Sequence, residues 1–415
     1  MSRSLLVIGG GPAGMMAALL FARAGVPVTV FEKHADFFRD FRGDTVHPST
    51  MEILDQLELL DIFLARPHNR IDSAQTRFGG NDYKLGDLSH LPTPAPFIAM
   101  MPQWEFLDFL RDEAMRYPHF TLHMEAKIAG LVEESGRVAG VQLDDGRIIT
   151  DGGGLVFAAD GRGSIVRDNA GFEADILGAP MDILWFSIPK SPDAQGGLRG
   201  VIDGGAMMVM IDRSDYWQCA YLIPKGSAEA LKAEGIAAFR ARIERLAPEL
   251  APLDTVLTDV AQLKLLSVAL DRLKNWSKPG LLVIGDAAHT MSPIGGVGIN
   301  LAIQDAVAAA NILAGPMAQG AAIDPLLAKV QARRMLPTRL IQAGQRLAQN
   351  GLITPLLQGK GPAKAPWIVR LLDRYPLLQR IPGRMVGLGI RRERVESPEA
   401  SASNPLPLAG GATQT

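Results

Sequence analysis

The sequence predicts an α/β protein in which a domain built on a parallel β-sheet is interleaved with a second, β-rich domain and followed by C-terminal helices. Three observations support this prediction. A βαβ pattern opens the chain, patterns of buried strands return near residues 155 and 281, and β-like segments separate these stretches. The chain has 415 residues, which is enough for about two to three domains.

The composition excludes several classes of protein. The 42 Lys and Arg residues nearly balance 44 Asp and Glu residues, which argues against a nucleic-acid partner. The single cysteine, Cys219, rules out an internal disulfide and fits a reducing cytoplasm. The 43 glycines exceed the usual share of about 7%, and because 47% of the residues are hydrophobic, they indicate close approaches of the backbone rather than disorder.

The first 31 residues predict a strand, a glycine turn, a helix and a second strand. Residues 5–8 are apolar, residues 13–24 have a helical composition that ends at Gly25, and residues 28–31 form another buried-strand pattern. Glycines interrupt the apolar run of residues 5–22, which argues against a signal peptide or a membrane span. The opening is therefore predicted to be a βαβ unit.

The middle of the chain breaks the simple alternation of strands and helices. Residues 71–101 and 185–224 are rich in β-like stretches, and residues 207–211 and 216–223 predict a hairpin. Periodicity predicts helices at residues 103–117, 236–246 and 297–313, and a buried strand at residues 281–284. Two domains interleaved in sequence are the expected result.

From residue 323 the pattern changes to arginine-rich helices. We expect prolines to break them, namely Pro337, Pro355, Pro362, Pro366, Pro376 and Pro382. A helical cover on the first domain is the favoured interpretation, and a peripheral contact with membranes is the alternative. Residues 397–415 are small, polar and without periodicity, and we expect them to be disordered.

A glycine motif lies between the first predicted strand and helix. In Gly9-x-Gly11-x-x-Gly14, the first glycine permits a tight turn, the second lets a pyrophosphate approach, and the third lets helix and strand pack closely. Glu32 ends the second strand, where its carboxylate can accept hydrogen bonds from an adenosine ribose. The unit predicts a dinucleotide-binding site, and an ordinary glycine turn is the alternative.

Two further motifs follow later strands. Residues 160–167 read Asp-Gly-Arg-Gly-Ser-Ile-Val-Arg, and residues 285–289 read Gly-Asp-Ala-Ala-His, followed by a proline- and glycine-rich turn at residues 293–300. Together and in this order, the motifs resemble the three fingerprints of the class A flavoprotein monooxygenases, the aromatic hydroxylases related to the p-hydroxybenzoate and ubiquinone-pathway hydroxylases. The likeness covers roughly the first 315 residues.

The resemblance implies an FAD cofactor and the residues that hold it. Asp286 would bind the ribityl hydroxyls, and the first turn of the helix near residue 298 would face the flavin. The expected cofactor-binding residues are Gly9, Gly11, Pro12, Ala13, Gly14, Glu32, Lys33, Arg42, Gln103, Ile128, Asp160, Asp286, Gly298, Ile299 and Asn300. Three of these residues have structural alternatives: Asp160 as a turn lock, Arg42 in a surface salt bridge and Ile128 as a core residue. Gln103 stands where many relatives carry arginine.

These expectations divide the chain into parts. Residues 1–70, 100–175 and 276–315 are expected to form a Rossmann-like FAD-binding domain, and residues 71–99 and 176–275 a substrate-binding β-sheet domain. Residues 316–396 would form the C-terminal helical region, and residues 397–415 the disordered tail. The protein is expected to be cytoplasmic, and monomeric or homodimeric.

The resemblance also implies the chemistry. NADPH or NADH would reduce FAD transiently, and a flavin C4a-hydroperoxide formed with dioxygen would hydroxylate a small phenolic, quinone-precursor or polyketide substrate. Pro293, Gly295 and Gly296 are expected to shape the catalytic site while the chain excludes water. No metal ion is expected, because the seven histidines show no close-spaced ligand pair.

The substrate is expected between the flavin and the predicted hairpin. Alternation places Gln218 on one face of the second hairpin strand, and Cys219 and Tyr221 on the other. The sequence leaves open which face lines the pocket. Gln218 and Tyr221 are candidate substrate contacts, with ordinary sheet positions as the alternative. Cys219 is expected in the core. His47 is expected at the surface, and a place at the site, reached through its loop, is the alternative.

Two other functions remain open from the sequence. A flavin-dependent reductase or saturase of an isoprenoid substrate would use the same cofactor cradle without inserting oxygen. A non-catalytic binding protein on the same fold would carry no flavin, and Asp286 and the turn at residues 293–300 argue against it.

Overall fold

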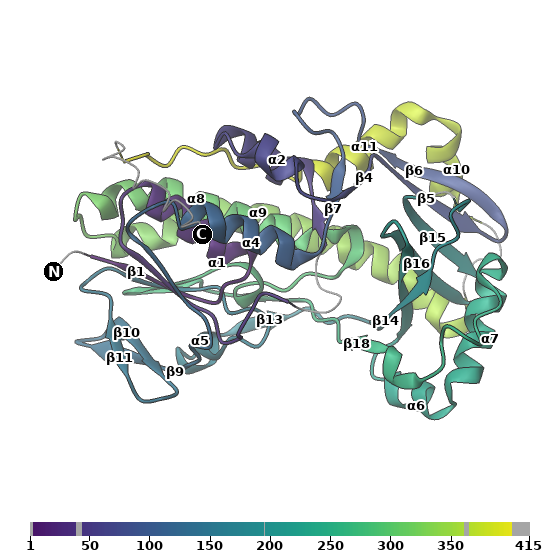
Figure 1. The fold of residues 1–415 in the computed structure, drawn as a ribbon, viewed down its shortest axis with the longest axis horizontal. Coiled ribbons are helices and arrows are strands. Elements are labelled where there is room, and N and C mark those ends of the chain that lie inside the picture. Colours follow the sequence, from purple (N-terminus) through teal and green to yellow (C-terminus); the bar gives the residue numbers. More distant parts are fainter. Residues whose placement is uncertain (1–2, 39–43, 195, 361–364, 401–415) are drawn as a thin grey trace, which may run out of the picture.

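Two β-sheets organise the molecule (Figure 1). The computed structural model describes residues 3–38, 44–194, 196–360 and 365–400. A six-stranded sheet has the strand order β20-β21-β12-β1-β2-β8, and a seven-stranded sheet has the order β18-β14-β17-β16-β15-β5-β6. Figure 1 shows the two sheets toward opposite ends of an elongated molecule, with long helices running beside the first.

The six-stranded sheet is parallel except at one edge. It contains β1 (Leu5–Ile8), β2 (Val28–Phe31), β8 (Phe120–His123), β12 (Leu155–Ala158), β21 (Leu281–Val283) and the antiparallel β20 (Ser277–Lys278). All residues of β1, β12 and β21 are buried. This burial explains their continuous apolar runs, because a parallel sheet is covered on both faces. The predicted βαβ opening is confirmed.

Helices α1 (Pro12–Arg23), α4 (Gln103–Ala114) and α8 (Gly298–Ala318) pack together beside this sheet. Small side chains on α1 and α8 allow close packing, and ten consecutive residues of α1 are buried. Residues 294–318 are long and apolar enough to cross a membrane, with a mean hydropathy of 1.4, but 72% of the apolar window is buried inside the fold. We therefore assign α8 as a core helix.

The seven-stranded sheet is mainly antiparallel. Its strands are β5 (Ser73–Phe78), β6 (Asn81–Asp87), β14 (Met181–Pro189), β15 (Leu198–Asp203), β16 (Ala206–Asp212), β17 (Tyr216–Pro224) and β18 (Lys264–Leu266). The predicted hairpin is confirmed, because β16 and β17 pair antiparallel with Met208 opposite Tyr221. Helix α7 (Ile236–Leu246) covers one face through Phe239 and Ile243.

Smaller elements connect and flank the two sheets. One three-stranded sheet contains β3 (Thr45–Val46), β7 (Ile98–Met100) and β4 (Asn69–Ile71), and another contains β9 (Ile128–Glu134), β10 (Arg137–Leu143) and β11 (Ile148–Thr150). Strands β13 (Ala174–Ile176) and β19 (Asp271–Leu273) form a pair. The short helices include α2 (Pro48–Gln56), α3 (Leu60–Leu64), α5 (Ile165–Asn169) and α6 (Ala228–Ala233).

The C-terminal helices correct one expectation. Helix α9 (Asp324–Ala348) continues through Pro337, and α11 (Pro376–Gly387) continues through Pro382, whereas Pro366 and Pro376 do lie at the starts of α10 (Trp367–Arg374) and α11. An interior proline costs a helix about 3 kcal/mol. The buried side of α9, including Thr338 and Gln342, packs on the core and outweighs this local cost.

The chain after α11 crosses the first domain without regular structure. The Asn311 amide donates to the Arg394 carbonyl oxygen at 2.7 Å, and the backbone N–H of Ala400 donates to the Arg23 carbonyl oxygen at 2.9 Å. The expected disordered tail began at residue 397. Residues 397–400 are described and contact α1 through Arg23, while residues 401–415 lie outside the described part.

Candidate functional site

The three sequence motifs meet at the carboxyl ends of β1, β12 and β21. A Cβ atom built on Gly9 would lie 2.5 Å from the Ala159 carbonyl oxygen, so the first motif touches the start of the second. A Cβ atom on Gly285 would lie 3.2 Å from the Cβ of Ala13, so the third motif touches the first. Open α/β sheets bind ligands at this edge of their strands.

The glycines of the first motif have separate physical roles. Gly9 has a φ of +97°, and a Cβ atom on Gly14 would lie 2.0 Å from the Gly9 carbonyl oxygen, so the turn and the helix packing exclude side chains there. A Cβ atom on Gly11 would meet nothing within 4 Å. The space beside Gly11 adjoins the start of α1, where Pro12 is the first helical residue. This cradle fits a pyrophosphate, since helix N–H groups favour anions.

Glu32 directly follows β2, beside the glycine turn. One carboxylate oxygen accepts a hydrogen bond from the Gly10 N–H at 2.9 Å, and the other accepts from the His34 N–H at 3.1 Å. Glu32 is buried and the neighbouring Lys33 is exposed. Ile128 is buried at the start of β9. The structure thus places Glu32 at the end of the strand next to the cradle, as a ribose contact requires.

The two motif aspartates have different surroundings. The Asp160 carboxylate accepts from the Val166 N–H at 3.4 Å at the start of α5, and burial raises its pKa. Asp286 is one-third exposed, and the Arg162 Nε–H donates to its Oδ2 at 3.1 Å. The Asp160 contact fits the alternative of a turn lock, while Asp286 keeps one-third of its side chain exposed.

The turn before α8 is fastened to the segment that contains β3. Gly295 and Gly296 have φ angles of +80° and +62°, and the Thr45 hydroxyl donates to the Gly296 carbonyl oxygen at 2.9 Å. The Asn300 side-chain oxygen accepts from the His47 N–H at 2.9 Å and from the Thr50 hydroxyl at 2.8 Å. The amide of Asn300 is thus structural. The backbone N–H groups of residues 298–300 lie in the first turn of α8, where an acceptor from outside the helix can bind them.

His47 lies beside this turn and corrects the expectation of a surface position. The side chain is fully buried, and its Nδ1–H donates to the Val386 carbonyl oxygen at 2.8 Å. Burial lowers the pKa of His47 to about 4, so the ring is neutral at neutral pH. Its Nε2 has no hydrogen-bond partner within the described residues and lies 3.5 Å from where a Cβ on Gly296 would stand.

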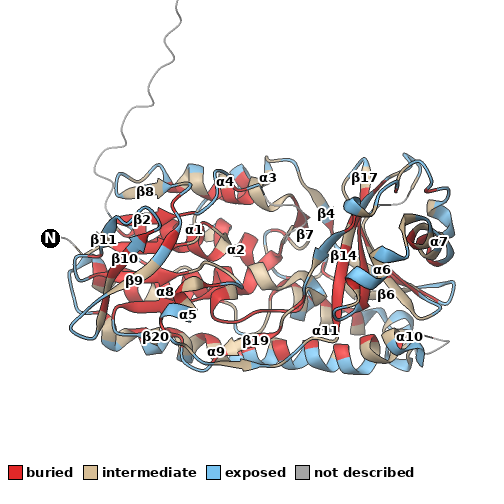
Figure 2. Ribbon diagram, turned by 90° about the horizontal axis from the view of Figure 1, so that it is seen from below, coloured by how far each residue is buried: buried red, intermediate tan, exposed pale blue. Residues whose placement is uncertain are grey.

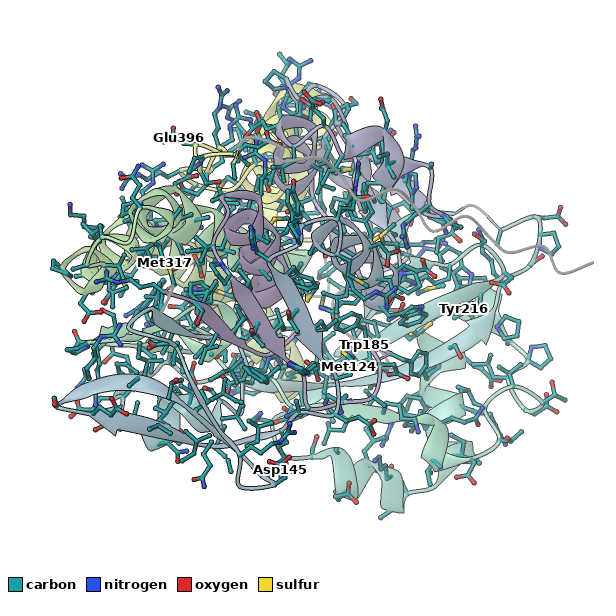
Figure 3. The ribbon with its side chains drawn as sticks, turned by 60° about the vertical axis from the view of Figure 1, so that its left-hand side comes forward. Met124, Asp145, Trp185, Tyr216, Met317 and Glu396 are labelled. Atoms are coloured by element: carbon teal, nitrogen blue, oxygen red, sulfur yellow. The ribbon has the colours of Figure 1, made fainter. Side chains whose placement is uncertain are left out.

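One face of the seven-stranded sheet points toward the turn. Ile294 of the turn packs in one apolar cluster with Trp185, Met207, Val209, Ala220 and Leu222. In Figure 3, Trp185 lies near the middle of the molecule, and Tyr216 lies farther out on the teal sheet. Gln218 shares this face by alternation with Ala220 and Leu222. An apolar wall therefore stands opposite the turn.

The structure separates the two candidate substrate contacts. Tyr221 points to the opposite face, where its ring packs edge-on against Phe239 of α7 with centroids 5.4 Å apart. Cys219 is buried on that same face, and burial raises the pKa of its thiol. Only Gln218 of the pair reaches the face toward the turn.

An ion pair that the sequence did not reveal lies at the edge of this face. Arg213, in the β16–β17 turn, donates to the Asp44 carboxylate, and its Nε–H donates to the Gln218 side-chain oxygen at 2.7 Å. The side chains of Arg213 and Asp44 are only 7% and 12% exposed. Burial raises the pKa of Asp44 despite the guanidinium, and the Gln103 N–H at the start of α4 also binds it. The charge of Arg213 is therefore compensated within the protein.

A second buried ionic network lies behind the third motif. The His289 Nε2 lies 2.6 Å from Asp305 Oδ2, and the Arg334 Nε–H donates to Asp305 Oδ1 at 2.9 Å. Another N–H of Arg334 donates to Glu393 at 3.0 Å. Although burial opposes it, His289 and Arg334 hold the pKa of Asp305 below its usual value. This network joins the third motif, α8, α9 and the C-terminal segment.

Arg42 and Gln103 are the two remaining cofactor residues that the sequence predicted. Arg42 lies outside the described residues. Gln103 is half-buried at the first position of α4, and its backbone binds Asp44. The signal for Asp44 was its place two residues after Arg42, an expected cofactor residue. Nothing local in the hairpin sequence indicated that Arg213 would reach it.

Comparison with known proteins agrees with this geometry. The FAD binding domain family matches residues 3–343. The chain is 34% identical over 397 residues to 6-methylpretetramide 4-monooxygenase of Streptomyces rimosus, covering 94% of this chain and 93% of that protein. It is 25% identical to 3-demethoxyubiquinol 3-hydroxylase of Escherichia coli K12, covering 84% and 89%.

Solved structures share the fold. PqsL of Pseudomonas aeruginosa, in complex with 2-aminobenzoylacetate, aligns with a TM-score of 0.74 at 22% identity, covering 87% of this chain and 98% of that chain. The anhydrotetracycline hydroxylase OxyS of Streptomyces rimosus aligns with a TM-score of 0.70 at 22% identity, covering 93% and 76%. The chain therefore belongs to the FAD binding domain family, and it is an FAD-dependent, NAD(P)H-consuming monooxygenase that hydroxylates an aromatic substrate.

Proposed function

We propose that this monooxygenase acts on an uncharged, largely apolar aromatic substrate of more than one ring, of the polyketide type. The observation that carries the proposal is the apolar sheet face opposite the turn, whose buried Arg213 is already neutralised by Asp44. An arginine in this state offers no free charge to a substrate carboxylate. The similarity to a hydroxylase named for 6-methylpretetramide supports the same substrate class.

The cofactor cradle fits FAD. Gly11 leaves open the space that a pyrophosphate needs, Glu32 would bind the ribose, and the partly exposed Asp286 would bind the ribityl chain. The N–H groups of residues 298–300, at the start of α8, would hold the flavin ring. When bound, FAD accepts hydride from NAD(P)H and activates dioxygen for insertion into the aromatic ring.

The chain itself positions the substrate and keeps the site dry and neutral. Pro293, Gly295 and Gly296 shape the turn that would lie beside the flavin, and the Thr45 hydroxyl fixes this turn by donating to the Gly296 carbonyl oxygen. His47 adds no charge, because its pKa is about 4. Water exclusion favours productive use of activated oxygen. Gln218, held by Arg213, is the polar group available to a substrate hydroxyl on this face.

The division into an FAD-binding domain, a substrate domain and C-terminal helices also belongs to this proposal. The two separate sheets support it, as do the C-terminal helices, of which α9 packs on α8 of the first domain while α10 and α11 pack on β6 of the second rather than on the first domain as expected. A cytoplasmic location is supported by the single, buried cysteine.

A matched substrate panel tests the proposal. The purified flavoenzyme is mixed with NADH or NADPH and with neutral polycyclic phenols or carboxylated single-ring phenols, and consumption of the nicotinamide is followed. We expect the neutral polycyclic compounds to stimulate consumption and to gain one oxygen-18 atom from labelled dioxygen. Faster, coupled turnover of the carboxylated single-ring phenols would overturn the substrate class, while oxygen-18 in either product would leave the monooxygenase activity standing.

A further inference from the structure

Exposed apolar side chains gather on the C-terminal helices. Within the described residues, 15 large hydrophobic side chains are exposed, and nine of them lie between residues 336 and 385. These nine are Leu336, Leu340, Leu347, Trp367, Ile368, Tyr375, Leu377, Ile381 and Met385, which we call the C-terminal apolar face. The other six are scattered over separate elements of the chain. Single exposed hydrophobics are ordinary, but a cluster indicates an interaction surface.

Packing fixes the orientation of α11. A Cβ atom on Gly383 would lie 2.0 Å from the Asp87 carbonyl oxygen, and a Cβ atom on Gly387 would lie 2.6 Å from Leu88. These contacts press one side of the helix against β6 and the loop after it. Leu377, Ile381 and Met385 recur every four residues on the opposite side, so they must face outward.

Helix α9 presents its apolar residues in the same manner. Its buried side contains Arg334, Thr338 and Gln342, while Leu336 and Leu340 are offset by half a turn and exposed. Ile341 of α9 and Met385 of α11 line the same small cavity, and α10 contacts α11. In Figure 2, α9, α11 and α10 follow one long edge of the molecule. The nine side chains therefore belong to adjoining helices.

The surrounding charge is strongly basic. Residues 324–387 contain 11 Lys and Arg residues, of which Arg334 is buried in the ionic network, but only two acidic residues, Asp324 and Asp373, in a chain whose net charge is −2. Exposed arginines accompany the apolar side chains on all three helices: Arg339, Arg346, Arg370, Arg374, Arg380 and Arg384. Asp324 is occupied by Arg137, and Asp373 accepts from the Lys84 N–H. Asp87, near Arg380, is bound by Ser89.

We propose that the C-terminal apolar face docks on an anionic lipid surface. Leucine, isoleucine and tryptophan would enter the boundary between headgroups and acyl chains, while the arginines meet lipid phosphates. A second copy of the chain fits less well, because a symmetric contact through this face would bring arginines opposite arginines without acidic partners. The proposal is independent of the substrate class.

Vesicle sedimentation tests the proposal with the full-length, FAD-loaded enzyme. We expect it to bind vesicles of phosphatidylglycerol and phosphatidylcholine, to bind phosphatidylcholine alone weakly, and to be released by high salt. Trp367 is 66% exposed, so its fluorescence should shift to the blue on binding. Absence of binding to the anionic vesicles at low salt would overturn the proposal.

A matched pair of variants locates the surface. Ile381 and Ile148 are 59% and 57% exposed, but only Ile381 lies on the proposed face. Ile381→Glu should weaken vesicle binding by about tenfold or more, since it adds an unfavourable charge and removes an apolar contact. Ile148→Glu should bind as the natural chain does, and both variants should keep their flavin.

Two results of this comparison would contradict lipid docking. Equal vesicle binding by Ile381→Glu and Ile148→Glu would show that the face is not the lipid contact. A dimer in sedimentation velocity that Ile381→Glu dissociates, without any vesicle binding by the natural chain, would assign the face to a second copy instead.

Discussion

The two large sheets differ in how they build their parts of the site. At the six-stranded sheet, backbone surrounds the cofactor cradle, and glycines mark the places where side chains are excluded. At the seven-stranded sheet, side chains form the site wall, and both faces are apolar: Phe186 and Cys219 face α7, while Trp185 and Ala220 face the turn. A site formed by the backbone can be recognised in the sequence from its glycine motifs. A site formed by side chains on a sheet shows in the sequence only as the alternation of residues between the two faces of a strand.

The largest expected effect separates two glycines of the cradle. Gly14→Val should prevent stable folding, because its Cβ atom would lie 2.0 Å from the Gly9 carbonyl oxygen. Gly11→Val should fold but lose FAD, because the new side chain meets no protein atom within 4 Å and occupies the pyrophosphate space. Circular dichroism and flavin absorbance per protein measure the two effects. Full flavin content in Gly11→Val would break the assignment of the cradle.

The next largest effect concerns the ionic network behind the third motif. Asp305→Asn should lower the free energy of unfolding by about 3–5 kcal/mol, because it weakens the pairing of the fully buried Arg334. The Arg147→Met control breaks an exposed pair with Asp145 and should leave the free energy of unfolding unchanged. Chemical denaturation measures both variants. Equal stability of the two variants would show that the network does not hold the domain together.

The pH dependence of stability tests the burial of His47 beside the turn before α8. Its pKa is about 4 in the folded protein against 6.5 as the ordinary value, so only the unfolded chain takes up the proton between these pH values. The free energy of unfolding should therefore fall by about 3 kcal/mol as the pH drops from about 6.5 to 4. Subtracting the profile of His47→Gln isolates this contribution. Parallel profiles for the two proteins would contradict the buried, neutral ring.

Asp44→Asn tests whether the neutralisation of Arg213 decides between charged and neutral substrates. The substitution keeps the size of the side chain but frees the charge of Arg213. The KM for carboxylated phenols should fall by about tenfold, the gain of one charge-assisted hydrogen bond, while neutral substrates gain nothing. Steady-state kinetics with one compound of each kind measures the difference. An equal change for both compounds would exclude a role in charge selection.

The smallest effect distinguishes the two faces of β17. Tyr221→Phe should leave KM and kcat almost unchanged, because the ring packs against Phe239 on the side away from the turn. Gln218→Leu should raise KM for a phenolic substrate severalfold, because it removes the polar group on the site face and a partner of Arg213. Equal effects of the two substitutions on KM would contradict the assignment of faces.

The sequence predicted local elements well where packing and local preference agree. The opening βαβ unit and the hairpin appear where periodicity placed them, since strands buried on both faces and paired alternating strands carry strong patterns. Proline residues predicted the ends of helices less well. Pro337 lies inside α9 because the anchoring of that helix to the core outweighs one lost hydrogen bond.

By itself, the sequence determined the parallel-sheet opening and the order of the three glycine-containing motifs, and it predicted Asp286 as a cofactor contact, because each depends on residues close together in the chain. Only the tertiary structure decided that His47 is buried and that the Tyr221 side chain points away from the turn before α8. It also decided that Asp44 neutralises Arg213, which lies 169 residues away in the sequence. Burial and charge pairing arise from packing between distant segments. No local pattern can encode them, whereas a glycine required by its own turn can be recognised from the sequence.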